Sequence, residues 1–418
     1  MYRSRSGETS GTIAPILCAS YNPGVASARP PLETLLAGFP AAELSTLIET
    51  RRDLHRHPEL GFEERRTAGI AAERLRRLGL SPRTGVGGTG VTADPPSRSA
   101  LRRILLRADM DGLPLSEETG APYASTIPGA MHACGHDGHV SIGLALAERL
   151  SGAPAAGRVR HLFQPAEEGA GGARACEADG VLEGVTAAFG LHLWNQLPVG
   201  KVGVSRGVLM AAVDEFGIDV EGPGGHGAAP HETYDAIVAA ARIVEALQTI
   251  VSREISPLDP AVVSVGSIHG GSAFNIIPKS VRLTGTVRSF SEAAFQALPG
   301  KMERIVQGTA EAAGVSARLD YRRVNRPTVN NPDMTDLVID AARRLLGDEN
   351  VETETRTLGG EDMSVFLDRV PGCFFFVGSA PEGRHRPHHS PVFDIDERAL
   401  AVGTALFEAV AIEAAKRL

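Results

Sequence analysis

Apolar residues recur every three to four positions, with charged residues between them, in the segment that begins at residue 41. This spacing predicts two amphipathic helices, over 41–60 and 63–80, broken at His57-Pro58 and at Gly79. Strand-like apolar runs then alternate with a helical pattern, as strands over 102–110, 157–166 and 186–194 and a helix over 139–150. The alternation is typical of an α/β fold in which a mostly parallel sheet is flanked by helices.

The pattern changes after Lys201. It predicts strand, helix, strand, strand, helix and strand, over 214–225, 235–255, 261–271, 279–290, 292–314 and 316–323. This is the split βαβ order of a ferredoxin-like α+β domain. We therefore expect a smaller domain, over 207–316, inserted between two parts of the α/β domain, over 41–206 and 317–418. Residues 1–40 are interpreted as a flexible extension.

Composition narrows the class of protein. Hydrophobic residues make up 43% of the chain and charged residues 22%, which is typical of a globular protein with a sizeable core. Lys plus Arg number 42 against 50 Asp plus Glu, a net charge of −8, which argues against nucleic acid as a partner. No apolar run has the ~18–20 residues of a membrane span. Four cysteines without a C-x-x-C pair favour a cytoplasmic location over a disulfide-stapled secreted fold.

Side chains able to bind metal gather where the predicted strands end. Asp109 and Asp111 close the first strand, and the next loop reads MHACGHDGH over 131–139, with Cys134 and His136 inside it. The following strands end at the pair Glu167-Glu168 and at His192. Open α/β sheets build sites at the carboxyl ends of their strands, and thiol, imidazole and carboxylate donors together suit Zn²⁺ or a similar ion. The cluster predicts a metal site.

Ordered motifs over about 45–415 extend this interpretation: HRHPELGFEE, RADMDGLP, MHACGHDGH, FQPAEEG, GLHLW, GGHGAAPH, NIIP, GTVR, GGED and HHSPVFDIDE. Together they closely resemble the amidohydrolase branch of the aminoacylase and carboxypeptidase metallopeptidase family. This branch contains hippurate hydrolases, N-acetyl-amino-acid deacetylases and plant auxin-conjugate hydrolases. The resemblance implies a catalytic α/β domain and an inserted lid or dimerisation domain.

The resemblance also implies two divalent ions per subunit, Mn²⁺ or Zn²⁺, with Co²⁺ or Ni²⁺ as alternatives. Their ligands map onto Cys134, His136, Glu168, His192 and His389. His389 stands four residues before Phe393, as the family's HxxxF pattern has it, and His388 stays the alternative ligand. The spacing leaves open which ligand serves which ion.

Catalytic roles follow from the same resemblance. Glu167 is expected to be the general base that takes a proton from water and passes it to the leaving amine. Asp109 or Asp111 is expected to orient a ligand imidazole. His226 resembles a histidine that reaches a partner subunit's site and stabilises the oxyanion.

Further residues are expected near the substrate. Asn275 and Arg288 resemble residues that bind the substrate carboxylate, and Glu361 is expected close to the ions. Asp137 and His139, which flank the ligand loop, are interpreted as structural. The chain departs from the family pattern at Gly360, Met363 and Ala236, where Ala, Phe and Pro are usual, and a reshaped pocket near Met363 is expected.

The resulting hypothesis is a metal-dependent amidohydrolase that cleaves N-acyl-L-amino acids, a small-molecule substrate, into a carboxylic acid and a free amino acid. It would work as a homodimer, or a higher homo-oligomer, joined through the inserted domain. A dipeptidase of the same family is the near alternative. A thiol hydrolase with Cys134 as nucleophile and His136 as base, or a metal-binding protein without catalysis, are the alternatives from other classes.

Overall fold

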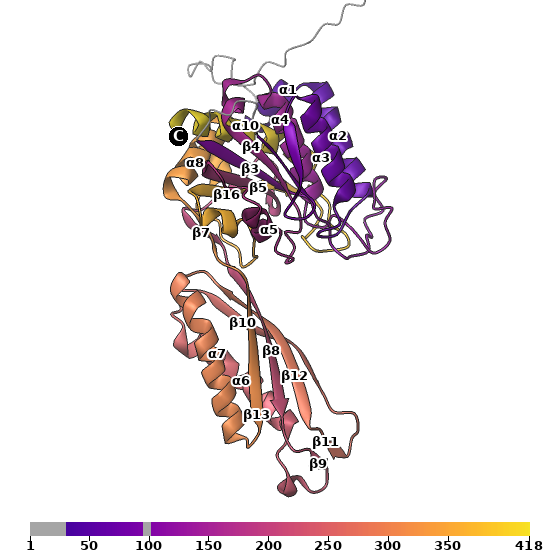
Figure 1. Cartoon of the computed structure of the whole chain (residues 1–418), viewed down its shortest axis with the longest axis vertical. Helices are drawn as coiled ribbons and strands as arrows, with labels where there is room; N and C mark the ends of the chain where they lie inside the picture. The colour runs from indigo at the N-terminus through magenta and orange to yellow at the C-terminus, as the bar shows by residue number, and fades with distance from the viewer. Residues whose placement is uncertain (1–30, 95–101) are drawn as a thin grey trace, which may run out of the picture.

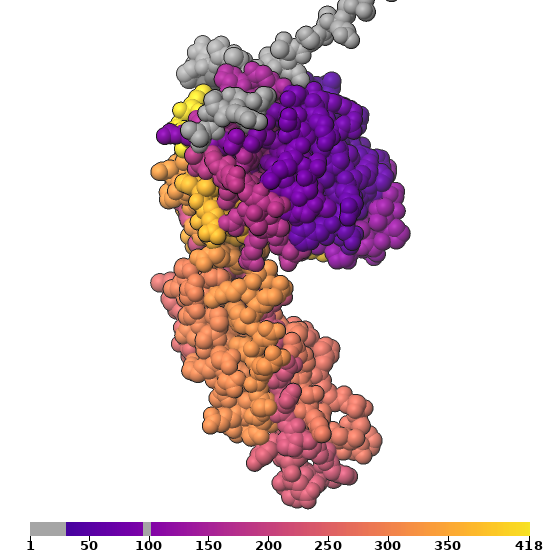
Figure 2. All heavy atoms as spheres, viewed as in Figure 1, coloured from indigo at the N-terminus to yellow at the C-terminus, as the bar shows by residue number. Residues whose placement is uncertain are grey.

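A computed structural model of the protein describes residues 31–94 and 102–418. It is elongated and consists of two bodies joined by extended strands (Figure 1). The larger body, here called the main domain, contains both early and late parts of the chain, and the smaller body, the lid domain, consists of residues 212–325. The two bodies meet at a narrow neck (Figure 2).

The main domain is built on a sheet to which the described residues contribute eight strands. Their spatial order is β1 (Ser81–Val86), β2 (Gly90–Asp94), β4 (Val159–Gln164), β3 (Arg103–Asp109), β5 (Val185–Pro198), β16 (Gly372–Ala380), β6 (Val202–Gly203) and β15 (Val351–Glu352). The central strands β4, β3, β5 and β16 run parallel to their neighbours in this group. Their carboxyl ends therefore lie along the same edge of the sheet, where open α/β folds place their sites.

Helices cover both faces of this sheet. One face packs against α1 (Pro31–Gly38), α2 (Ala41–Arg56), α4 (His136–Leu150), α8 (Pro332–Leu346) and α10 (Arg398–Arg417). The opposite face packs against α5 (Gly172–Ala178) and α9 (Ser364–Leu367), while α3 (Arg65–Arg77) lies over β1 and β2. Because β3 is covered on both sides, its apolar run is continuous: Ile104 and Leu106 face one core and Leu105 faces the other.

The lid domain is an antiparallel sheet with two helices on one face. In the part of the chain that the structure describes, its strands are ordered β10 (Ala261–Gly270), β12 (Ser280–Ser289), β8 (Ala212–Glu221) and β13 (Ser316–Asn325). The helices are α6 (Ala236–Thr249) and α7 (Glu292–Ala312), whose apolar sides pack on the sheet. This is the ferredoxin-like order, so the predicted fold class, an α/β domain with a smaller α+β domain, is confirmed.

Short elements mark the neck and the far end of the lid. At the neck β7 (Gly207–Met210) pairs with β14 (Thr328–Asn330), and at the tip β9 (Gly225–His226) pairs with β11 (Ile276–Ile277). Four further short helical turns lie within the described residues, at Pro154–Arg158, Pro230–Glu232, Ile250–Glu254 and Asp348–Asn350. No helix within 31–94 or 102–418 combines the length and apolarity that crossing a membrane requires.

The structure differs from the predicted boundaries in three places. The lid sheet begins at Ala212, because residues 207–210 form β7 of the neck, and not at the predicted 207. β13 belongs to the lid sheet, so the lid reaches Asn325 and passes the boundary predicted at 316. Residues 31–38, predicted to be part of a flexible extension over 1–40, instead form α1, because Leu35 and the following Phe39 are buried against the main core. Residues 1–30 lie outside the described residues.

Candidate metal centre

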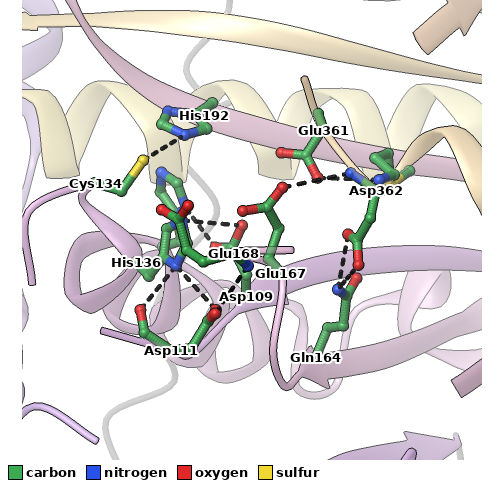
Figure 3. A network of polar contacts seen from close by, with 12 residues as sticks. Asp109, Asp111, Cys134, His136, Gln164, Glu167, Glu168, His192, Glu361 and Asp362 are labelled. Carbon is green, nitrogen blue, oxygen red and sulfur yellow. Dashed lines mark hydrogen bonds and ion pairs between the residues drawn. The ribbon is translucent and has the colours of Figure 1, made fainter. Parts of the chain in front are cut away.

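The edge at which the parallel strands end brings the predicted ligands together, and Figure 3 shows Cys134, His136, Glu168 and His192 among them. Cys134 lies in the loop before α4, and His136 is the first residue of that helix. Glu168 follows β4, and His192 lies on β5. His389 comes from the segment between β16 and α10. Five side chains from distant parts of the sequence thus converge, as the order of the strands requires.

The donor atoms form several overlapping groups among the described residues, and two of these groups share Cys134. In one, the atoms of Cys134, His136 and His192 lie within 4.8 Å of one another, and in the other so do those of Cys134, Glu168 and His389. Cys134 Sγ is 3.4 Å from His192 Nε2, and His389 Nε2 is 3.1 Å from Glu168 Oε1. His136 Nε2 is buried and has no hydrogen-bond partner among the described residues. A buried imidazole nitrogen aimed at sulfur and carboxylate donors fits a metal ion, and a shared thiol fits two of them.

Burial shifts the pKa values of His192 and Cys134 in directions that bear on their chemistry. Burial lowers the pKa of His192 well below its usual value, which keeps the imidazole neutral, as a ligand must be. Burial, followed by the nearby Glu168 and Glu167 carboxylates, raises the pKa of the Cys134 thiol well above its usual value. A nucleophilic cysteine needs the opposite shift, so the environment of Cys134 argues against a thiol hydrolase.

Asp111 and Asp109 hold different histidines. His136 Nδ1 lies 2.9 Å from the Asp111 carbonyl oxygen and 3.2 Å from Asp111 Oδ1. Asp109 Oδ1 is 2.5 Å from Nδ1 of His139, whose Nε2 accepts the Leu193 N–H. The geometry therefore places Asp111 behind the candidate ligand His136, which leaves Nε2 free for a metal. Asp109 contacts His139 most closely, and its Oδ2 also lies 3.6 Å from His136 Nε2.

His388 and Asp137 have other partners. His388 Nε2 lies 3.0 Å from the Leu193 carbonyl oxygen, and its ring packs on Trp194 with centroids 4.8 Å apart. The neighbouring His389 has a positive φ of 58°, a conformation that turns its side chain to Glu168. Asp137 accepts a hydrogen bond from Arg51 of α2. The geometry favours His389 over His388 as the ligand.

Comparison with known proteins identifies the family to which the chain belongs. Residues 105–413 match peptidase family M20/M25/M40. The chain belongs to this family. It is 40% identical over 373 residues to an N-acetylcysteine deacetylase of Bacillus subtilis, an alignment that covers 88% of this chain and 96% of that enzyme. It is 38% identical to an IAA-amino acid hydrolase of Arabidopsis thaliana, over 87% of this chain and 84% of that one.

A solved structure from Bacillus subtilis, described as a dinuclear metal binding peptidase from the M20 family, superposes with a TM-score of 0.79. It is 35% identical and covers 91% of this chain and 100% of that chain. The resemblance expected from the motifs is thereby confirmed. The protein is a hydrolytic M20 enzyme that acts on amides, which excludes the non-catalytic alternative.

In this M20 enzyme Glu167 borders a buried network of charges. Arg107, in the middle of β3 and fully buried, donates to Asp109 at 2.6 Å, to Glu361 at 2.8 Å and to Asp362 at 3.0 Å. The Asp362 N–H donates to Glu167 Oε1 at 3.4 Å. Burial, and then the Glu361 carboxylate, raise the pKa of Glu167 well above its usual value, the direction a general base requires.

Sequence reasoning missed part of this network. It singled out Glu361, but not Arg107, Asp362 or Gln164, whose side-chain nitrogen donates to both Asp362 carboxylate oxygens at 2.9 Å. The available signal was the arginine itself, because a charged residue inside an otherwise apolar, doubly covered strand must find buried partners.

A cavity of about 670 Å³ opens in front of these groups, between the main domain and the base of the lid. Cys134, Glu167, Glu168 and His192 line it from the main domain, and Arg288 of β12 lines it from the lid. The Arg288 guanidinium contacts Thr286 Oγ1 and the Val287 carbonyl, and it forms no ion pair within the described residues. A guanidinium that forms no ion pair among the described residues therefore faces the same cavity as the donor groups, although Glu215 lines that cavity too.

His226 and Asn275 do not join this site within one chain. Both are exposed and lie at the tip of the lid, where β9 and β11 pair (Figure 1). The Asn275 carbonyl accepts the Gly227 N–H at 2.8 Å, so the two residues lie beside each other there. Asn275 and Arg288, predicted to share a substrate carboxylate, thus lie at opposite ends of the lid.

Two positions at which the sequence departs from the family pattern, Gly360 and Met363, lie differently with respect to the cavity. Met363 is fully buried in the core beside α9 and does not line the cavity, so the expected reshaping near it is not observed. Gly360 does line the cavity. A Cβ placed on Gly360 would lie 1.9 Å from a Val213 methyl, so the absence of a side chain lets the first lid strand seat against this loop.

Proposed function

We propose that this M20 enzyme hydrolyses the amide bond of N-acyl-L-amino acids, releasing a carboxylic acid and a free amino acid. The observation that carries the proposal is the unpaired Arg288 guanidinium, which faces one cavity together with Glu167 and the donor groups. A guanidinium suits the α-carboxylate that an N-acyl amino acid retains. The relatives named for N-acetylcysteine and for IAA-amino acid substrates support this class.

In this scheme Cys134, His136, Glu168, His192 and His389 hold two divalent ions, of which Mn²⁺ and Zn²⁺ suit the donors best and Co²⁺ and Ni²⁺ are the alternatives. Bound ions would polarise the amide carbonyl and favour ionisation of water. Glu167 accepts the proton of the attacking water and delivers it to the leaving nitrogen. Asp111 keeps the His136 ring in one orientation. Arg288 binds the substrate carboxylate.

We further propose that the enzyme acts as a homodimer, joined through the lid and located in the cytoplasm. β10 is an edge strand, and the lid carries exposed apolar side chains at Ile237, Val238, Ile268, Phe274 and Ile276. Such a surface suits a second copy of the chain. In that assembly His226 and Asn275 would serve the neighbouring subunit's cavity. The free thiols of Cys134, Cys176 and Cys373 are compatible with a reducing compartment.

A hydrolysis screen tests the proposed substrate class. Metal-stripped enzyme is supplied with Mn²⁺, Zn²⁺, Co²⁺ or Ni²⁺ and offered hippurate, N-acetyl-amino acids and dipeptides. We expect turnover of the N-acyl substrates. Hydrolysis of dipeptides alone would contradict the proposal and favour the dipeptidase.

Removal of metal is expected to abolish activity, because all five donors would lose the group they hold. The measurement is the rate after dialysis against a chelator and after return of a divalent ion. Trp194, the single tryptophan of the chain, packs against His192 with ring centroids 5.4 Å apart, so its fluorescence should report metal return independently of turnover. Full activity of metal-free protein would contradict this prediction.

Arg288→Met is expected to raise KM for N-acyl amino acids about 10- to 100-fold, since a charge-assisted hydrogen bond contributes ~1.5–3 kcal/mol. The matched control is Arg282→Met on the same strand, because Arg282 is already paired with Asp219. KM for the corresponding amide, which lacks the carboxylate, should be similar in both variants. An unchanged KM for the acid would remove Arg288 from substrate binding.

A further inference from the structure

The turn that carries Glu167 and Glu168 begins at a residue with an unfavourable backbone conformation. Ala166 has φ of 53°, the left-handed region, and is fully buried. In this region the Cβ atom of a residue other than glycine lies too close to a carbonyl oxygen. The conformation therefore persists only where surrounding contacts impose it. The direction in which Glu167 leaves the main chain depends on that turn.

Glu64 supplies one of those contacts. Its side chain is buried, and Oε1 accepts the Ala166 N–H at 2.8 Å. Glu64 Oε2 accepts a hydrogen bond from the Thr89 hydroxyl. Among the described residues Glu64 forms no ion pair. Gly61 of the same segment lies directly over the turn, since a Cβ placed on it would be 3.2 Å from Ala166 Cβ. A buried carboxylate without a cation is unfavourable for stability, which makes a purely structural reason for Glu64 a weak one.

The segment 58–64 also contacts the loop after β3, which contains Asp111 and Gly112. The Glu59 carbonyl accepts the Gly112 N–H at 2.7 Å. The neighbouring Asp111 accepts the Glu168 N–H through Oδ2 at 2.9 Å and lies behind His136. One segment therefore supports both loops whose relative position sets the distance between Glu167 and the donor groups.

We propose that Glu64 is a positioning residue, which holds the left-handed turn at Ala166 and so aims Glu167 at the substrate. The proposal rests on the role proposed above for Glu167. Glu64 takes no part in proton transfer or ligation itself. Its contribution should therefore show in kcat and in the order of the turn, with little effect on KM.

The test uses Glu64→Met, which keeps the volume but removes the acceptor. Assayed as the metal-saturated enzyme on N-acetyl-amino acids, kcat should fall about 10- to 100-fold, as for a displaced catalytic group, with KM within about threefold. Glu64→Gln retains an acceptor oxygen and should restore most of the rate. The matched control is Glu63→Ala, an exposed glutamate next to Glu64, which should leave kcat unchanged.

The specific readout is whether Ala166→Gly restores the rate that Glu64→Met loses. Ala166→Gly adopts positive φ without a steric penalty, so in the Glu64→Met background it should recover at least about fivefold in kcat. Hydrogen exchange of the 163–170 peptide, measured by mass spectrometry, should be faster in Glu64→Met and is independent of turnover. It therefore separates failure of this proposal from failure of the proposed activity.

Unchanged kcat and unchanged exchange in Glu64→Met would overturn the proposal, and so would a loss that follows thermal stability and is not suppressed by Ala166→Gly. If Glu64→Met does not fold, Thr89→Val removes one donor to the Glu64 carboxylate. It should then lower kcat about two- to fivefold and be suppressed by the same glycine. Thr89→Val without effect would overturn the proposal equally.

Discussion

Glu167→Gln is expected to lower kcat by about 10²–10⁴-fold, the usual contribution of a general acid–base group, while metal content and fold are retained. The reason is that Glu167 is proposed to move protons and not to hold an ion. It belongs to neither group that contains Cys134, although its carboxylate also lies close to His136 and Glu168 and to Glu361 and Asp362. Its amide analogue keeps the volume and can accept the Asp362 N–H, but it cannot take up a proton. The measurement is kcat together with metal content by mass spectrometry.

The adjacent glutamate provides the control. Glu168 lies 3.1 Å from His389 and shares a donor group with Cys134, so Glu168→Gln should lose metal as well as rate. If Glu167→Gln lost the ions while Glu168→Gln kept them, the order of the two glutamates would be reversed.

The gathering of metal-capable side chains at one sheet edge was predictable because parallel strands place their carboxyl ends on one edge, whatever the length of chain between them. The choice of individual ligands rested on the resemblance to the family. The roles of Asp109 and Asp111 were not predictable. Residues i and i+2 of a strand point to the same side, so periodicity cannot separate them. The separation comes from α4, which presents His136 to Asp111 and His139 to Asp109.

The Arg107 network shows a second limit. Its partner Glu361 lies 254 positions away in the sequence, and only the pairing of β3 with the rest of the sheet brings the two together. The helix α1 was missed for a related reason. Its eight residues have little helical periodicity of their own, and they are ordered by packing on α8 and α10 from the other end of the chain.

The placement of His226 raises the question of which chain it serves. Glu167 lies in the main domain beside the neck, whereas His226 lies at the tip of the lid, exposed and with no carboxylate partner in the described residues (Figure 1). The residues of the motif do not by themselves say on which subunit a side chain acts, and the expectation of a partner subunit came from the family resemblance. In this chain His226 and the cavity lie at opposite ends of the lid, and the proposal above therefore assigns His226 to a neighbouring subunit's cavity.

Subunits with His226→Ala and subunits with Glu167→Gln should therefore complement each other. Each variant alone should be nearly inactive, with the loss in His226→Ala about 10²–10³-fold in kcat, as for removal of an oxyanion donor. In a two-fold symmetric heterodimer, one cavity would combine Glu167 of one subunit with His226 of the other, and the second cavity would have neither. Heterodimers isolated through two different affinity tags should then recover about half of the wild-type activity per dimer. Activity at the level of the parents, in heterodimers shown to be intact, would instead require His226 to act within its own chain or not at all.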